Sequence, residues 1–200
     1  ENFTFDGEEA IELRVWVKTN SIKINSAELQ ITRAQIELGQ GKILEATDIL
    51  HNEERETATF TFAEDIPTGS CILNLAFTGI LNDQLRGFYR SQYTGSDGQI
   101  MYMATTQFEA TDARRAFPCW DDPSTKAIFQ VNLIVPSDLQ AISNTLPFED
   151  SNIENGKKLV RFEESPKMST YLLAFIVGDI ACVEANAANN TLIRVWATRG

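Results

Sequence analysis

Histidine and cysteine are scarce in this sequence, and their scarcity excludes several kinds of site. The 200 residues include one histidine, His51, and three cysteines, Cys71, Cys119 and Cys182. A catalytic zinc site needs about three protein ligands, usually including two histidines, so these residues cannot form one. Neither H-E-x-x-H nor C-x-x-C spacing occurs, which excludes the corresponding zinc and redox motifs. We expect reduced, mostly buried thiols, and this usage favours a cytoplasmic protein.

Positive charge is also in short supply. The chain carries 17 Lys and Arg against 28 Asp and Glu, a formal net charge of -11 at pH 7. Nucleic acids are bound through clustered Lys and Arg that release counterions, so we expect no nucleic-acid partner. Long apolar runs are absent as well. The longest, Tyr171–Val177, is too short to span a bilayer, and we therefore expect no transmembrane segment.

What the sequence does contain is a regular alternation of apolar and polar residues. Alternation with a period of two is typical of β-strands with one buried face. It runs through Ile11–Val17, Ala58–Phe62, Cys71–Phe77, Ala127–Val135 and Ile193–Ala197. Tyr171–Val177 is continuously apolar, which fits a strand covered on both faces. The sequence therefore predicts an all-β domain of many short antiparallel strands.

Turn signals separate these runs. They lie at Gly39–Gly41, Ile66–Gly69, Ser96–Gly98 and Asn155–Gly156. The last is a hairpin signal, because Asn and Gly accept the positive φ that a two-residue hairpin turn needs. Helix signals are weak: Asp112–Phe117 predicts at most one short helical turn, capped by Thr111 or Asp112 and stopped by Pro118.

Chemically useful groups are concentrated in Thr105–Phe129. If Thr105–Ala110 is a strand, Gln107 and Glu109 point to one face and Phe108 to the other. A carboxylate beside an amide can bind a cationic amine, as an exopeptidase must when it holds a free N-terminus. The alternative is an ordinary solvated strand face, where Gln and Glu are common. The residues alone leave both interpretations open.

Arg114 and Arg115 lie in the same run. Guanidinium groups bind carboxylates bidentately, so this pair can clamp an anionic ligand. Because several acids are nearby in the sequence, we favour structural ion pairs instead. The candidate partners are Asp112, Asp121 and Asp122.

Two further groups of the run have a structural alternative. Cys119 can act as a nucleophile only with a base in hydrogen-bond reach, and His51 is the one histidine, so we favour core packing. No G-x-S-x-G element supports a catalytic triad either. Asp121 and Asp122 can form a carboxylate pair for a metal, but Asp before Pro123 is more typical of a turn.

Three blocks of the chain together carry a family resemblance. They are Phe77–Tyr93 (FTGILNDQLRGFYRSQY), Thr105–Phe129 (TTQFEATDARRAFPCWDDPSTKAIF) and Met168–Asp179 (MSTYLLAFIVGD). In order and spacing they resemble the N-terminal domain of zinc metallo-aminopeptidases of the aminopeptidase N and puromycin-sensitive aminopeptidase type. The resemblance covers nearly the whole chain. We therefore expect residues 1–200 to be one N-terminal β domain, a piece of a longer protein.

The resemblance implies a fold and two binding residues. The fold is a saddle-shaped, sandwich-like assembly of antiparallel β-sheets that closes one side of an active site. Glu109 would bind the α-amine of a peptide, and Gln107 would line the first side-chain subsite. Ala110 and Asp122 depart from the Pro and Glu common in the family, and neither belongs to this pair.

The resemblance also implies what this segment does not supply. The family's zinc ligands and its G-A-M-E-N loop belong to a second domain downstream of Gly200, so no residue here is expected to be catalytic or metal-binding. The full-length protein would be a zinc-dependent aminopeptidase, and this segment alone would be inactive. Expected partners are peptide substrates and the downstream catalytic domain of the same chain. The alternative is a non-catalytic scaffold or partner-binding module of the same fold.

Overall fold

The computed structural model describes residues 3–199, and it confirms the all-β prediction. The strands are β1 Thr4–Val15, β2 Thr19–Asn25, β3 Leu29–Glu37, β4 Ile43–Asn52, β5 Thr57–Ile66, β6 Gly69–Ile80, β7 Gly87–Thr94, β8 Ile100–Gln107, β9 Lys126–Ala127, β10 Asn132–Pro136, β11 Gln140–Ser143, β12 Pro147–Ile153, β13 Lys157–Phe162, β14 Met168–Ser169, β15 Phe175–Gly178, β16 Ile180–Asn186 and β17 Leu192–Thr198. Three single 3₁₀ turns accompany them: η1 Gly39–Gly41, η2 Ala113–Arg115 and η3 Thr170–Leu172. The sequence predicts only η2, so two short helical turns come in addition to the one expected.

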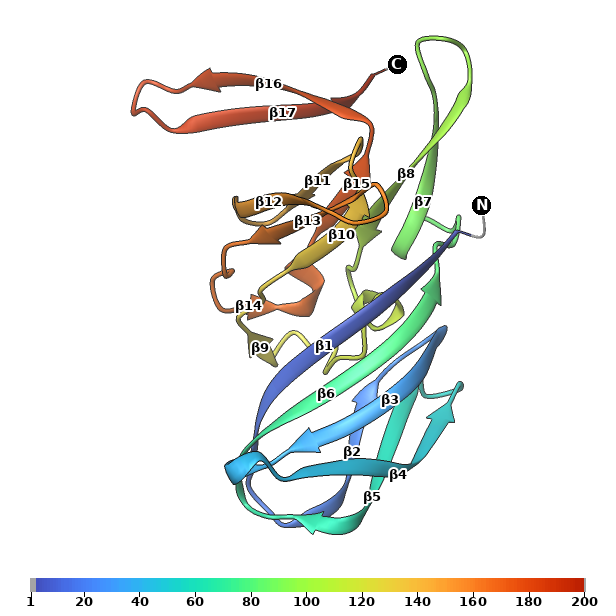
Figure 1. Cartoon of the computed structure of the whole chain (residues 1–200), viewed down its shortest axis with the longest axis vertical. Helices are drawn as coiled ribbons and strands as arrows, with labels where there is room; N and C mark the ends of the chain where they lie inside the picture. The colour runs from blue at the N-terminus through green and yellow to red at the C-terminus, as the bar shows by residue number, and fades with distance from the viewer. Residues whose placement is uncertain (1–2, 200) are drawn as a thin grey trace.

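The largest sheet is a six-stranded antiparallel sheet with the order β1-β6-β3-β4-β5-β2 (Figure 1). β4 joins its two halves, because the start of β4 pairs with β3 and the remainder pairs with β5. The sheet curls, and alternate side chains of the two halves meet inside it. The centre of this core is formed by Ala58, Phe60, Phe62, Leu73 and Leu75. The strands predicted from alternation at Ala58–Phe62 and Cys71–Phe77 are thus confirmed.

Smaller sheets follow along the chain and lie above the six-stranded sheet in the view of Figure 1. One has four strands in the order β11-β15-β8-β7, and another has three in the order β10-β13-β12. β9 pairs with β14, and β16 with β17 forms a hairpin that projects sideways from the rest (Figure 1). β8, which leads into the sequence-predicted site, is an inner strand held by β7 on one side and β15 on the other.

A row of aromatic rings joins the six-stranded sheet to the four-stranded sheet. Phe5 of β1 meets Phe88 of β7 with ring centroids 5.0 Å apart, and Phe88 meets Phe175 of β15 at 4.9 Å. Phe108 lies 6.1 Å from Phe175 and 5.9 Å from Phe117. Edge-to-face pairs of this kind add about 0.5–1.5 kcal/mol each beyond the area they bury. The end of β8 is therefore attached to both sheets through one aromatic core.

The strand predicted over Tyr171–Val177 is broken in the structure. Its first two residues belong to η3, and only Phe175–Gly178 forms a strand. The 3₁₀ turn allows the Thr170 hydroxyl to donate to Asp121 Oδ1 at 2.8 Å and buries Leu173 in the second core cluster. Both contacts join segments that are distant in sequence, which periodicity cannot reveal.

The strand predicted over Ala127–Val135 is also interrupted, since β9 ends at Ala127 and β10 begins at Asn132. Between them, Phe129 accepts a backbone hydrogen bond from Ser165 at 2.9 Å, and its own N–H donates to the Ser165 hydroxyl at 3.0 Å. The alternation is real, but the partner of this stretch is an irregular segment, so no continuous ladder forms.

The four predicted turns are confirmed. Asn155 and Gly156 connect β12 to β13 with φ of 63° and 67°, the positive values that a tight hairpin turn demands. The other three turn signals lie between β3 and β4, β5 and β6, and β7 and β8. Local chemistry alone therefore located these reversals of the chain.

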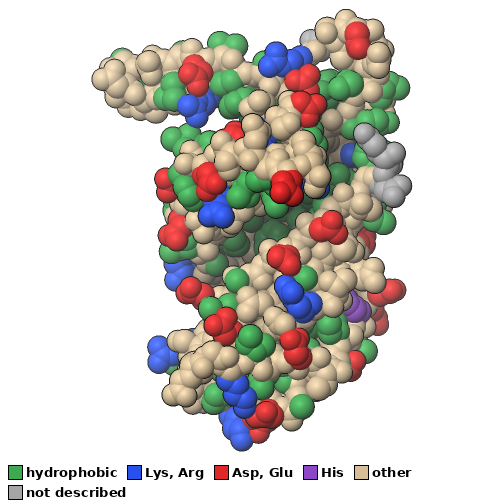
Figure 2. All heavy atoms as spheres, in the orientation of Figure 1, with side chains coloured by type: hydrophobic (Ala, Val, Ile, Leu, Met, Phe, Trp, Pro, Cys, Tyr) green, Lys and Arg blue, Asp and Glu red, His purple; other side chains and the backbone are tan. Residues whose placement is uncertain are grey.

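Acidic and basic side chains are mixed on the face of the molecule that Figure 2 shows. Figure 2 shows acidic side chains dispersed over the visible face, with Lys and Arg side chains among them. Within residues 3–199, no helix is both long and apolar enough to cross a bilayer.

Candidate functional site

Gln107 and Glu109 lie where β8 ends, not along a continuous strand. β8 stops at Gln107, which pairs with Gly87 of β7, and the next residues form a turn. We expected a strand over Thr105–Ala110 to place both side chains on one face. That expectation is wrong, because the strand does not continue past Gln107. Both residues are nevertheless exposed, and Phe108 between them is 2% exposed. The strand ends here because the chain turns to keep Phe108 in the core.

We call Phe108–Asp112 the Glu109 turn. It is closed by a hydrogen bond of 2.9 Å from the Asp112 backbone N–H to the Phe108 carbonyl, and η2 follows directly. Phe108 packs in a buried cluster with Ala113 and Leu173. Within residues 3–199, the side chains of Gln107 and Glu109 form no hydrogen bond or ion pair. The neighbouring side chains of Thr106 and Asp112 do form hydrogen bonds. Their polar groups are available to a ligand.

Arg115 binds the turn from its C-terminal side. Its Nε donates to Asp112 Oδ1 at 2.8 Å, and its two terminal nitrogens donate to Glu28 and Glu56, each at 2.5 Å. The side chain is only 8% exposed. Burial disfavours the charged guanidinium, but the hydrogen bond to Asp112 and the charges of Glu28 and Glu56 outweigh it and raise the pKa of Arg115.

Arg114 makes a second set of ion pairs that points toward the six-stranded sheet. Its Nε donates to Asp121 Oδ2 at 3.0 Å, and one terminal nitrogen donates to Glu56 at 3.1 Å. Asp121 is buried, and its other oxygen accepts from Thr170. Both arginines thus form structural ion pairs, as we favoured from the sequence. Two of the predicted partners, Asp112 and Asp121, take part in them.

The sequence does not identify Glu28 and Glu56 as partners of the arginines. The third partner predicted from it, Asp122, pairs with neither arginine. Glu28 lies between β2 and β3, and Glu56 lies between β4 and β5, so each is far from the arginines along the chain. No local spacing signals these pairs. Asp122 instead accepts from the hydroxyl and then the backbone N–H of Ser124, which lowers the pKa of its carboxyl and fits the predicted turn.

Gly87 brings β7 into close contact with Arg115. A Cβ atom at this position would lie 2.7 Å from the Arg115 Cβ, and the φ of Gly87 is +66°. Both the space and the backbone conformation therefore require glycine. Since Gly87 pairs with Gln107, this contact sets the arginine directly beside the strand pair that carries Gln107.

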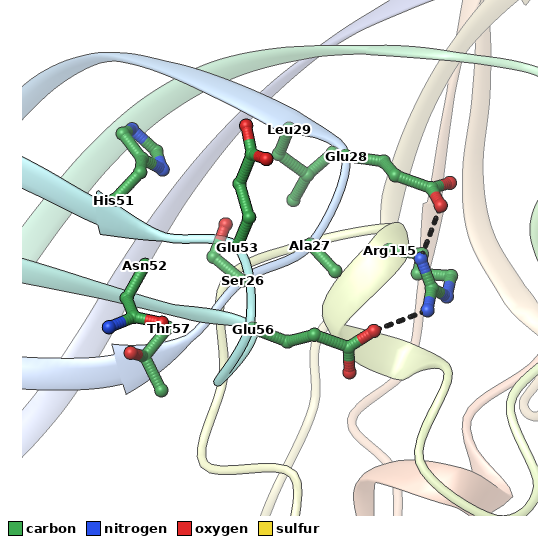
Figure 3. A pocket seen from close by; sticks show the side chains of 10 residues that line it. All are labelled: Ser26, Ala27, Glu28, Leu29, His51, Asn52, Glu53, Glu56, Thr57 and Arg115. Atoms are coloured by element: carbon green, nitrogen blue, oxygen red, sulfur yellow. Dashed lines mark hydrogen bonds and ion pairs between the residues drawn. The ribbon is translucent and has the colours of Figure 1, made fainter.

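A surface pocket of about 500 Å³ opens beside Arg115. Its lining comes from the β2–β3 connection, the β4–β5 turn and Arg115, and includes Ser26, Glu28, His51, Glu53 and Glu56. Figure 3 shows Glu28 and Glu56 extending toward Arg115 from two separate segments, while His51 lies at the opposite end. Gln107 and Glu109 do not line this pocket.

Cys119 packs in the core, as we favoured from the sequence. It is 5% exposed, and burial, followed by the charges of Asp121 and Glu9, raises the pKa of its thiol well above the ordinary value. Because the thiolate is the nucleophilic form, this site suppresses nucleophilic reactivity. Among residues 3–199, no group of three or more His, Cys, Asp or Glu side chains is placed to hold a metal ion, so these residues do not fit a zinc centre.

Sequence comparison decides the family. Residues 1–172 match the peptidase M1 N-terminal domain. The chain belongs to that family. The resemblance to the N-terminal domain of zinc aminopeptidases is thereby confirmed, and the β8 end with the Glu109 turn lies well inside the matched part of this M1 domain.

The relatives of this M1 N-terminal domain are aminopeptidases. It is 45% identical over 201 residues to aminopeptidase 2 of Candida albicans and 44% identical over 207 residues to the alanine/arginine aminopeptidase of Saccharomyces cerevisiae. It is 41% identical over 200 residues to aminopeptidase M1 of Arabidopsis thaliana. These matches cover 98–100% of this chain but only 21–23% of the relatives. The chain thus spans about a fifth of their length.

Proposed function

We propose that this chain is the substrate-recognition domain of a zinc-dependent M1 aminopeptidase that removes N-terminal residues from peptides. Glu109 receives the substrate α-ammonium, and Gln107 lines the first side-chain subsite. The observation that carries the proposal is the pair itself: two exposed acceptors, without a side-chain partner among residues 3–199, flank a deeply buried phenylalanine at the end of a strand. They lie in a domain whose relatives are aminopeptidases.

The physical basis is the need to measure one residue from a chain end. A carboxylate held at a fixed place accepts charge-assisted hydrogen bonds from a free ammonium, and an internal peptide bond has no such group to offer. Phe108 supplies the fixed place, because its burial anchors the backbone between the two acceptors. The domain thus contributes recognition and orientation of the substrate.

The chemistry of bond cleavage belongs to residues outside this chain. A zinc ion held by the downstream catalytic domain would activate water for attack on the first peptide bond. The proposed partners of this segment are therefore peptide substrates and that domain. The proposal includes a cytoplasmic location, which is supported by three cysteines that remain unpaired in the described part of the chain.

The proposal is tested by Glu109→Ala in the full-length protein. A hydrogen bond to a charged group contributes about 1.5–3 kcal/mol, so we expect kcat/KM for substrates with a free N-terminus to fall roughly 10- to 100-fold. Steady-state kinetics with aminoacyl fluorogenic substrates measure this. Glu154→Ala, in the exposed β12–β13 turn, is the matched control and should leave kcat/KM unchanged.

Unchanged kinetics in Glu109→Ala would remove this residue from the site. A full-length protein that lacks aminopeptidase activity altogether, yet binds a partner through this domain, would favour the scaffold interpretation instead.

A further inference from the structure

The ion pairs of Arg115 connect the Glu109 turn to the six-stranded sheet, and we propose that Arg115 positions Glu109 for binding the substrate amine. This inference rests on the proposed function, since it extends the role given to Glu109. Arg115 acts through the turn and touches neither substrate nor reacting atoms, so it is a positioning residue.

On one side, Arg115 holds the Glu109 turn itself. Its side-chain Nε and its backbone N–H both donate to Asp112, to Oδ1 at 2.8 Å and to the carbonyl at 3.2 Å. Asp112 in turn donates its backbone N–H to Phe108. Both ends of the segment that carries Glu109 are therefore fixed, and a movement of Arg115 is transmitted to Asp112 and to the direction of Glu109.

On the other side, Arg115 holds the six-stranded sheet. Its two terminal nitrogens donate to Glu28, which precedes β3, and to Glu56, which precedes β5 (Figure 3). All three guanidinium nitrogens thus have a carboxylate partner, each on a different segment. A lysine ammonium has its three donors on one nitrogen and cannot reproduce this planar connection through three separate nitrogens.

Gly87 extends the connection to Gln107. Because a Cβ on Gly87 would overlap the Arg115 Cβ at 2.7 Å, the arginine packs directly on the residue that pairs with Gln107. Arg115 therefore contacts both the Glu109 turn and Gly87 of β7, the strand that pairs with β8.

Arg114 provides a matched comparison on the same 3₁₀ turn. Its side chain is similarly buried, 12% exposed against 8% for Arg115, and it also binds Glu56. Its remaining side-chain partner is Asp121, and among the described residues its side chain forms no hydrogen bond or ion pair with the Glu109 turn. A general supporting role would be shared by both arginines, whereas positioning of Glu109 belongs to Arg115.

The test is a double-variant cycle in the full-length protein, with kcat and KM measured for Arg115→Lys, Glu109→Ala and the two combined. We expect Arg115→Lys to lower kcat/KM about 10-fold or more, chiefly through KM, because the amine contact already exists in the bound ground state. The combined variant should be no worse than Glu109→Ala alone, since Arg115 acts through Glu109. Any loss of kcat/KM caused by Arg114→Lys should multiply with the loss caused by Glu109→Ala, because Arg114 does not act through Glu109.

If the losses of kcat/KM in Arg115→Lys and Glu109→Ala multiply in the combined variant, the inference is overturned but the proposed function is not. Full activity in Arg115→Lys would overturn the inference as well. Full activity in Glu109→Ala would overturn the proposed function and, with it, the inference on Arg115. This result distinguishes the two failures. If Arg115→Lys does not fold, Glu28→Gln removes one anchor at a half-exposed carboxylate, and the same non-additivity with Glu109→Ala is required.

Discussion

Glu9 is a buried carboxyl whose replacement should make the protein more stable. It lies on β1 opposite Leu75 of β6, on the strand face that also holds Gly7 and Ile11. Its Oε1 atom is buried and has no hydrogen-bond partner within residues 3–199. Burial raises the pKa of this carboxyl well above its ordinary value of 4.5. We consider Glu9→Met, which keeps the length of the side chain and removes the polar group.

The expected magnitude follows from the missing hydrogen bond. A buried polar group without a partner costs about 1–3 kcal/mol, so Glu9→Met should raise the free energy of unfolding by about that amount at neutral pH. For a chain of this size, each kcal/mol raises Tm by about 2–4 °C.

The pH dependence has a definite sign. The folded protein retains a proton that the unfolded chain has lost, so the contribution of Glu9 to stability falls as pH rises from 4.5 through the raised folded-state pKa. Glu9→Met does not titrate. Its stability advantage over the wild type must therefore be larger at about pH 8 than at about pH 5.

Urea unfolding followed by tryptophan fluorescence, repeated across this pH range, measures the difference. Glu12→Met is the matched control, because Glu12 lies on the exposed face of the same strand and its replacement should change stability by no more than about 0.5 kcal/mol. A Glu9→Met protein that is less stable than the wild type would refute the reasoning. So would an advantage that stays constant with pH.

Two further outcomes are expected. Gly87→Ala should destabilise the protein more than Gly98→Ala does, because both glycines have positive φ but only Gly87 has the Arg115 Cβ in the space that a new Cβ would take. The backbone strain common to both is about 1–2 kcal/mol, and equal losses in thermal unfolding would mean that the close contact with Arg115 has no energetic weight. The 200-residue chain alone, assayed with aminoacyl substrates and added zinc, should show no aminopeptidase activity. Sustained metal-dependent turnover would contradict the assignment of zinc chemistry to another domain.

Much of the fold could be predicted because β-strands and turns carry local signals. The alternation at Cys71–Phe77 predicts a strand with one buried face, and the side chains of that face, Cys71, Leu73, Leu75 and Phe77, are all buried in the core. Asn155 and Gly156 predict a hairpin because few other residues accept positive φ, and the hairpin is present. These signals depend only on neighbouring residues, so they can be read without the three-dimensional arrangement.

Strand continuity could not be predicted in the same way. Tyr171–Val177 is apolar throughout, yet it begins with a 3₁₀ turn, because Thr170 is bound to Asp121 from a distant part of the chain. β8 likewise ends at Gln107 rather than Ala110, since Phe108 packs among residues from other segments. A hydrophobic pattern records which residues become buried but not which partner they meet.

The sequence by itself determined the all-β class, the positions of the hairpin turns, the candidate acceptors Gln107 and Glu109, and the lack of residues for a zinc site. Only the tertiary structure decided how the acceptors are held. Arg115 is bound by Glu28 and Glu56, which are separated from it by 87 and 59 positions in the chain. Ion pairs across such separations depend on how the sheet curls and where its connections meet. That arrangement results from the packing of the whole core, and no local sequence pattern encodes it.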